Sequence, residues 1–435
     1  MMLGRKQCVG SSASHHTLPG AQLPLHRCAF TAASRSQGCS SARTNSSRCR
    51  SSSKESPFLE GVQFHQPGWS GIETEQQFFG KMEADAAVGR FPKKLIPVWQ
   101  DFYNNYRNAI VGSGVQGANE LLASKIQATI ADCVMLQLVQ PYTFPSVHKR
   151  ILEPYNYYEF GQRYVGALID FEASVLGQPE RWATIEAQLA AKHNVILLAN
   201  HQTEADPGVF AHMLAASHPE MATSVVYVAG DRVITDPLSK PFSMGRNLFC
   251  VHSKKHINDI PELYQEKADT NRKTLVAMAR RLNEGGALIW IAPSGGRDRS
   301  LTPDGVDFLP DPFDASAVEL MRSLTARAKQ PGHLYPMAMY SWPVMPPPKT
   351  VDKTMGERRL TNYTGVGISV AEELDVATLL AGIEDKEQQQ KHLAAVAFEE
   401  VSKEYGSMMA AIKVPTARGP GTKFVQPWAK QPAMV

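Results

Sequence analysis

Five short runs of apolar residues punctuate this 435-residue chain after position 190, and polar or amphipathic stretches separate them. Apolar runs of about four to eight residues predict buried strands, and the stretches at 270–282 and 315–328 have the spacing of amphipathic helices. Alternation of the two predicts an α/β domain. The runs lie at 195–199, 224–229, 287–291, 334–339 and 366–370.

The pattern before residue 150 is different, because apolar residues recur there every three or four positions. This spacing predicts helices, and the Val-Gly-Ser-Gly turn at 111–114 separates two of them. We therefore expect a helical bundle domain at 56–150 and an α/β domain at 151–435, with a last helix at 388–408. The apolar residues with helical spacing are Leu95, Trp99, Phe102, Tyr103, Tyr106, Ile110, Leu122, Ile126, Ile130 and Cys133.

The first 54 residues have a composition of their own: twelve serines, eight Lys and Arg, and no acidic residue before Glu55. Segments that are rich in Ser and Arg and poor in acids are typical of organelle transit peptides, and the apolar core of a secretory signal is missing. An ordinary disordered tail is the alternative. We predict a disordered transit peptide at 1–55 that is removed near its end.

Removing that segment changes the sign of the net charge. The whole chain has 45 Lys and Arg against 42 Asp and Glu, a net charge of +3, whereas the residues after 54 have 37 against 42, a net charge of −5. Because nucleic-acid binding needs a basic surface, this balance argues against a nucleic-acid partner. No apolar stretch approaches the roughly 20 residues that cross a bilayer, so we expect no transmembrane segment.

Only Cys133 and Cys250 follow the predicted transit peptide. One pair of cysteines forms no disulfide framework, and a Cys-x-x-Cys spacing is missing, so the sequence predicts no bound metal and a reducing compartment. Cys250 ends an apolar stretch and is better explained as a small buried hydrophobe than as a nucleophile. The Gly-x-Ser-x-Gly elbow of serine hydrolases is also missing.

The strand predicted at 195–199 leads into Asn-His-Gln-Thr-Glu-Ala-Asp-Pro at 200–207. Asp206 suits the N-cap of a helix and Pro207 its first position, so the chain turns here and Asp206 can fold back toward His201. A carboxylate on one ring nitrogen leaves the other as a base, as in the serine-protease triad. In the alternative, Asp206 only caps the helix, but a corner after a strand favours catalysis.

Two later segments carry positive charge, Ser-Lys-Lys-His at 253–256 and Gly-Gly-Arg-Asp-Arg at 295–299. Arginine binds phosphate oxygens through two parallel hydrogen bonds, and lysine acts as a point charge. In an extended loop the two arginines point the same way and Asp298 points away. A solvated face is the alternative for 253–256, and Arg246 is a secondary candidate. The candidates to hold a phosphate are Lys255, His256, Arg297 and Arg299.

These motifs closely resemble those of the soluble plastid glycerol-3-phosphate acyltransferases, a family within the glycerolipid acyltransferases that share a His-x-x-x-x-Asp centre. The resemblance rests on 200–207, 236–248, 253–256 and 291–299, and it extends from about residue 75 to the end of the chain. Ser294 stands where membrane-bound relatives usually carry Glu, which fits the plastid branch.

The resemblance implies a helical bundle beside a mixed α/β sheet that helices flank. It implies transfer of a fatty acyl group from acyl carrier protein, or acyl-CoA, to the sn-1 hydroxyl of glycerol-3-phosphate in the plastid stroma, without a cofactor. His201 and Asp206 would be the catalytic pair, and the four basic candidates would hold the acceptor phosphate. A lysophospholipid acceptor and a noncatalytic module that binds phospholipid or acyl carrier protein remain as alternatives.

The basic residues between 272 and 281 are a candidate surface for acyl carrier protein, although an ordinary solvated helix face is the simpler explanation. These residues are Arg272, Lys273, Arg280 and Arg281.

Overall fold

The computed structural model describes residues 56–252, 257–258, 260–300, 308–347, 358–418 and 421–429. The predicted transit peptide at 1–55 lies outside these ranges, as do Lys255 and His256. All of the described residues belong to one compact unit. The domain boundary expected near residue 150 stays a prediction.

The described residues contain one nine-stranded sheet. Its strands are β1 (Val147–His148), β2 (Val175–Gly177), β3 (Asn194–Ala199), β4 (Val226–Ala229), β5 (Asn247–Cys250), β6 (Leu288–Ile291), β7 (Gly332–Tyr340), β8 (Gly367–Val370) and β9 (Phe424–Val425). The order is β1-β5-β4-β6-β3-β7-β8-β2-β9. Strands β5, β4, β6, β3 and β7 run parallel, whereas β8 is antiparallel to β7, so the sheet is mixed as the resemblance implies.

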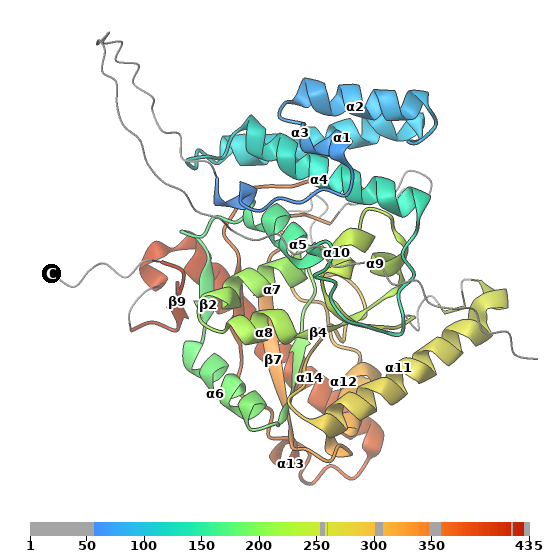
Figure 1. The fold of residues 1–435 in the computed structure, drawn as a ribbon. Helices are drawn as coiled ribbons and strands as arrows, with labels where there is room; N and C mark the ends of the chain where they lie inside the picture. Colours follow the sequence, from blue (N-terminus) through green and yellow to red (C-terminus); the bar gives the residue numbers. More distant parts are fainter. Residues whose placement is uncertain are drawn as a thin grey trace, which may run out of the picture. The chain divides into compact units, whose positions relative to one another are not determined.

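Helices surround this sheet (Figure 1). The α-helices of the described residues are α1 (Pro67–Ser70), α2 (Glu75–Ala87), α3 (Ile96–Gly112), α4 (Glu120–Val139), α5 (Tyr157–Gly166), α6 (Pro179–Ala190), α7 (Asp206–Ala215), α8 (Pro219–Ser224), α9 (Asp231–Thr235), α10 (Lys240–Met244), α11 (Tyr264–Glu284), α12 (Ala315–Ala326), α13 (Val376–Leu379) and α14 (Lys386–Lys413). Short 3-10 helices occur at Pro57–Leu59, Lys93–Leu95, Pro261–Leu263 and Pro415–Ala417.

The central strand β3 faces a separate core on each side, because successive side chains of a strand point to opposite faces. Val195 and Leu197 belong to a core shared with helices α3 to α7. Ile196 and Leu198 belong to a second core shared with α11, α12 and α14. All residues of β3 are buried, which explains why the residues from Val195 to Ala199 are a continuous apolar run.

Helix α4 is the central helix of the N-terminal region and packs against α1, α2 and α3. With 20 residues, it is long and apolar enough to cross a membrane, by length and composition alone. This finding corrects the expectation that no apolar stretch approaches that length. In the structure 78% of its most apolar window is buried inside the protein, as in the core helix of a folded domain.

The structure confirms the five predicted strands as β3, β4, β6, β7 and β8, with small differences at their ends. Strand β4 begins at Val226 rather than at 224, because α8 continues through Ser224. The predicted helices at 270–282, 315–328 and 388–408 correspond to α11, α12 and α14. The apolar run around Cys250 proves to be β5, a strand that the sequence analysis does not predict.

Candidate active site

His201 lies in the loop between β3 and α7, at the carboxyl end of the central strand, and Asp206 is the first residue of α7. His201 Nδ1 is 2.7 Å from Asp206 Oδ2, so the structure brings together the two residues that the sequence pairs. Because a carboxylate only accepts hydrogen bonds, Nδ1 is the donor of this pair, and in the neutral ring Nε2 is then an acceptor. The His201 side chain is 26% exposed, and its ring stands edge-on to Trp290. Such an imidazole can take a proton from a ligand.

Asp206 is buried and accepts hydrogen bonds from four donors. Besides His201, Oδ2 accepts the backbone N–H of Gln202 at 2.8 Å. Oδ1 accepts the N–H of Thr203 at 3.2 Å and the Ser341 hydroxyl at 2.5 Å. Four donors match the capacity of an ionised carboxylate. The expected N-cap position is wrong by one residue, since α7 begins at Asp206 itself, and its carboxylate bonds N–H groups of the preceding loop.

Asn200 and Gln202 fasten this loop to the neighbouring strand β7 and to the residue that follows it, and both side chains are buried. Asn200 Oδ1 accepts the N–H of Met339 at 2.7 Å, and its Nδ2 donates to the Met339 carbonyl at 3.1 Å. Gln202 Oε1 accepts the N–H of Ser341 at 2.9 Å. The sequence analysis assigns neither residue a role, although both stand in the motif at 200–207.

Asp298 connects the loop after β6 to the loop after β3. Its backbone N–H donates to the His201 carbonyl at 2.5 Å. Its carboxylate accepts Asn200 Nδ2 at 2.8 Å and the N–H of Asp311 at 3.1 Å. The side chain is 1% exposed, so the two loops share a buried polar junction. The sequence analysis does not predict this role, because nothing in the sequence around Asp298 indicates that it contacts residues far away along the chain.

Arg297 and Arg299 flank Asp298 on the loop after β6. Asp298 is buried, Arg299 is exposed and Arg297 is half-buried, which agrees with the expected alternation. Burial raises the pKa of Glu204, but the charges of Arg359 and Arg297 outweigh it and hold this pKa below its usual value. The Arg297 charge therefore acts on Glu204, in the loop that carries His201. This is expected, because the two loops follow the adjacent parallel strands β6 and β3.

Arg359 is a second link of the His201 loop to the rest of the protein. Its Nε donates to Glu204 Oε2 at 2.8 Å, and its Nη2 donates to Asp236 Oδ2 at 2.8 Å. The Arg359 side chain is nearly buried. Loss of the guanidinium would leave two carboxylates without compensation, which is costly at buried positions. The ion pairs thus fix the loop against the segment between α9 and α10.

The pH dependence of stability should report on Asp298. Burial raises the pKa of Asp298 to about 7, although hydrogen bonds from Asn200 and Asp311 and the charge of His201 oppose the rise; the charge of Asp206 adds to it. The pKa of an unfolded aspartate is about 3.9. Between these values the folded protein holds a proton that the unfolded chain lacks, so stability falls as the pH rises through this window.

We expect Asp298→Asn, which resembles the neutral acid, to remove this fall. The free energy of unfolding of the wild-type protein should drop relative to the variant by up to roughly 4 kcal/mol as the pH rises from about 4 to 7. Urea unfolding of both proteins at several pH values measures the difference. Parallel pH profiles would show that Asp298 is ionised in the folded protein throughout.

The remaining sequence candidates lie elsewhere or take other roles. Arg246 is buried, donates to Gln162 Oε1 at 2.5 Å and lies over the Tyr158 ring, so it stabilises contacts of α5. Burial raises the pKa of the Cys250 thiol to about 12. A thiol with so high a pKa stays protonated, so Cys250 packs as a small buried hydrophobe and is not a nucleophile. Within the described ranges, no cluster of three or more His, Cys, Asp and Glu side chains is suited to a metal ion.

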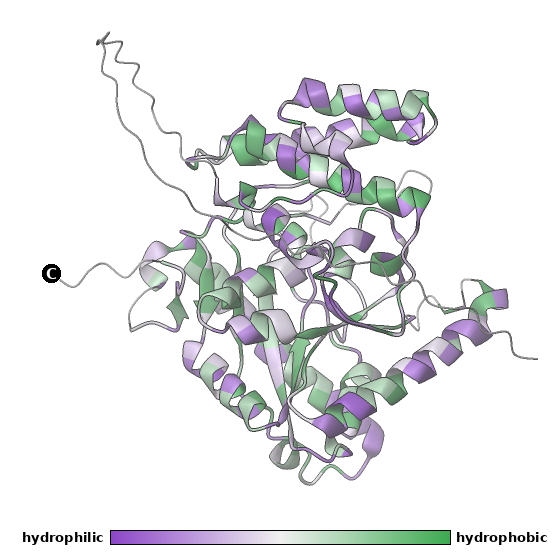
Figure 2. Cartoon of the chain, viewed as in Figure 1, coloured by the Kyte–Doolittle hydropathy of each residue, from purple (hydrophilic) through white to green (hydrophobic). Residues whose placement is uncertain are grey.

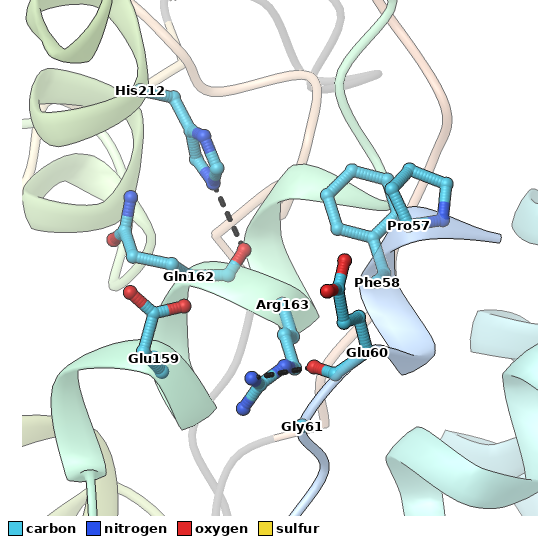
Figure 3. Close-up of a pocket in the computed structure, with 8 residues that line it drawn as sticks. All are labelled: Pro57, Phe58, Glu60, Gly61, Glu159, Gln162, Arg163 and His212. Atoms are coloured by element: carbon cyan, nitrogen blue, oxygen red, sulfur yellow. Dashed lines mark hydrogen bonds between the residues drawn. The ribbon is translucent and has the colours of Figure 1, made fainter.

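A cavity of about 410 Å³ lies between α5, α7 and the residues around Phe58 (Figure 3). Arg163 Nη2 donates to the Glu60 carbonyl at 2.8 Å, and His212 Nε2 lies 2.9 Å from the Gln162 carbonyl oxygen. Burial lowers the pKa of His212 to about 4, so its ring is neutral. None of the lining residues belongs to the loops after β3 or β6, and His212 contributes to packing between helices.

The fold and the site geometry are those of an α/β enzyme with an imidazole–carboxylate pair and a loop that carries two arginines. His201, its buried carboxylate partner and the loop of Arg297 and Arg299 follow the carboxyl ends of parallel strands, where such sheets bind ligands. A histidine whose open nitrogen is oriented by a carboxylate serves in proton transfer during acyl transfer or hydrolysis.

Comparisons with known proteins specify the family. Residues 67–142 match the family model described as glycerol-3-phosphate acyltransferase N-terminal, and residues 183–340 match the acyltransferase model. A chloroplastic glycerol-3-phosphate acyltransferase of Cucurbita moschata is 41% identical over 84% of this chain and 82% of its own length. The Arabidopsis thaliana relative of the same description is 40% identical, over 84% and 80%. This chain belongs to the glycerol-3-phosphate acyltransferase family, as its motifs indicate.

Proposed function

We propose that this chain transfers a fatty acyl group from a thioester of acyl carrier protein to the sn-1 hydroxyl of glycerol-3-phosphate. The observation that carries the proposal is the His201–Asp206 pair, whose open Nε2 lies at the edge of the sheet where the Arg297 loop also begins. Membership of the family supports the acceptor. The product, 1-acyl-glycerol-3-phosphate, is the first intermediate of glycerolipid synthesis.

In this proposal His201 acts as the general base. Nε2 takes the proton of the C1 hydroxyl while the hydroxyl oxygen attacks the thioester carbonyl carbon, and the Asp206 carboxylate stabilises the imidazolium. The tetrahedral oxyanion then collapses and the carbon–sulfur bond breaks. The leaving thiolate takes the proton back from Nε2, so the imidazole is neutral again and no acyl-enzyme forms.

Arg297 and Arg299 hold the acceptor phosphate in the same proposal. This group carries about −1.5 to −2 charges near neutral pH, and guanidinium groups bind its oxygens bidentately. Fixing the phosphate orients the C1 hydroxyl toward His201, and orientation of this kind reaches effective molarities of roughly 10⁵–10⁸ M. Lys255 and His256 are included among the proposed phosphate-binding residues because of the family resemblance alone.

The plastid stroma is the proposed compartment. The similar proteins of Cucurbita moschata, Arabidopsis thaliana and Spinacia oleracea are described as chloroplastic. Residues 1–54 have the Ser-rich, Arg-rich and acid-free composition of a transit peptide. Import would remove this segment near residue 55.

Thiol release from acyl carrier protein thioester by the full chain tests the proposed function. We expect release only when glycerol-3-phosphate is present, together with formation of the 1-acyl product. Release without the acceptor would indicate a thioesterase, and faster release with 1-acyl-glycerol-3-phosphate would indicate a lysophospholipid acceptor. No release from the carrier thioester or from acyl-CoA would contradict the proposal and favour a binding module.

A further inference from the structure

The outward face of α11 carries a basic stripe with an apolar centre. Thr274, Met278 and Leu282 are the buried residues of this helix. Positions three or four apart share one face of a helix, so the stripe lies opposite the side that packs on the sheet. The exposed members of the stripe are Arg272, Lys273, Val276 and Arg280.

We propose that this stripe docks acyl carrier protein, taken as a small acidic protein that presents its thioester to His201. The proposal rests on the proposed function and adds to it the surface that recognises the donor. Much of α11 is hydrophilic and extends from the body of the protein, so its outward face is open to a partner (Figures 1 and 2).

The charges of the stripe suit an acidic partner. Arg272 forms an ion pair with Asp269 at 2.8 Å. In the described part of the chain, Lys273 and Arg280 have no ion-pair partner. They flank Val276, whose side chain is 58% exposed. An apolar centre with a charged rim is the usual anatomy of a protein interface, and unpaired cations on the rim attract and orient an acidic protein.

The position of α11 suits delivery of a thioester. Thr274 Oγ1 donates to the Cys250 carbonyl at 2.7 Å, and Asn271 Nδ2 donates to the His252 carbonyl at 3.0 Å. These bonds fasten the first half of α11 to the carboxyl end of β5. Strands β5, β4, β6 and β3 are parallel, so this end of the sheet is also the one that carries His201.

An anionic membrane surface is the competing partner for a basic helix. Exposed apolar residues near the start of α11, Ile260, Leu263 and Tyr264, are compatible with it. However, the residues after 54 have a net charge of −5, so a broad anionic surface repels most of the protein. A small partner can contact the local stripe alone, which favours the carrier protein.

The double variant Lys273→Glu/Arg280→Glu in the full chain tests the docking surface, with acyl carrier protein thioester and acyl-CoA compared as donors. We expect the KM for the carrier thioester to rise by about tenfold or more, while kcat and KM with acyl-CoA stay unchanged. The matched control is Lys391→Glu/Lys403→Glu on α14, which makes the same change of net charge at exposed positions. It should leave both donors unaffected.

Three results would overturn the docking proposal: an unchanged KM for the carrier thioester, an equal loss with both donors, and an equal loss in the α14 control. Loss of binding to vesicles of phosphatidylglycerol, with the carrier KM unchanged, would assign the stripe to membranes instead. Failure of the wild-type protein with both donors would contradict the proposed function itself, so the two failures are distinguishable.

Discussion

Replacement of His201 by alanine is expected to lower kcat by about 10²- to 10⁴-fold, the usual contribution of a general base. The substitution removes Nε2, the open nitrogen that the Nδ1–Asp206 hydrogen bond orients. Because the side chain is partly exposed, its loss should cost little stability. Binding of glycerol-3-phosphate, measured by titration calorimetry, should remain close to that of the wild-type protein.

Arg297→Ala is the informative control for this experiment. It removes a proposed phosphate contact and leaves the base in place, so it should raise the KM for glycerol-3-phosphate more than it lowers kcat. The two variants together separate proton transfer from acceptor binding. Turnover by His201→Ala within a few-fold of the wild-type rate would eliminate His201 as the base, whatever Arg297→Ala does.

The central fold is predictable because β3, β4, β6, β7 and β8 are apolar runs that polar or amphipathic stretches separate. Burial on both faces forces a continuous apolar sequence on such strands, and that pattern is visible without a structure. Strands β1, β2 and β9 are two or three residues long. They form by pairing with strands that are distant in sequence. Two or three residues are too few to show the alternation of apolar and polar positions that identifies a strand.

The same contrast between local and distant contacts holds within the candidate site. His201 and Asp206 are five residues apart, in the loop after β3 and at the start of α7, so sequence alone suggests their contact. Ser341 reaches Asp206 across 135 positions, and Arg359 reaches Glu204 across 155. These contacts depend on the neighbouring strand β7 and the segments that follow it, which the local pattern around 200–207 does not encode. Local motifs therefore predict the candidate catalytic pair better than the residues that hold it in place.

Asp206→Asn should be nearly as damaging as loss of the base, with a fall in kcat of about 10³- to 10⁴-fold. All four groups that face the carboxylate are donors, and each oxygen accepts one backbone N–H, from Gln202 or Thr203. An asparagine amide places its own N–H₂ against one of these donors in either orientation. If that amide faces His201, the ring is driven to the tautomer that protonates Nε2, and a protonated Nε2 cannot act as a base.

Ser341→Ala is the matched control for this prediction, since it removes one donor from Oδ1 and leaves the carboxylate and the His201 bond intact. We expect its kcat to stay within about tenfold of the wild-type value, because the carboxylate keeps its charge, its bond to His201 and both backbone N–H donors. The KM for glycerol-3-phosphate should change little in either variant. If Asp206→Asn and Ser341→Ala have equal kcat values, the negative charge of Asp206 is not what orients His201, and its role is only to hold the loop.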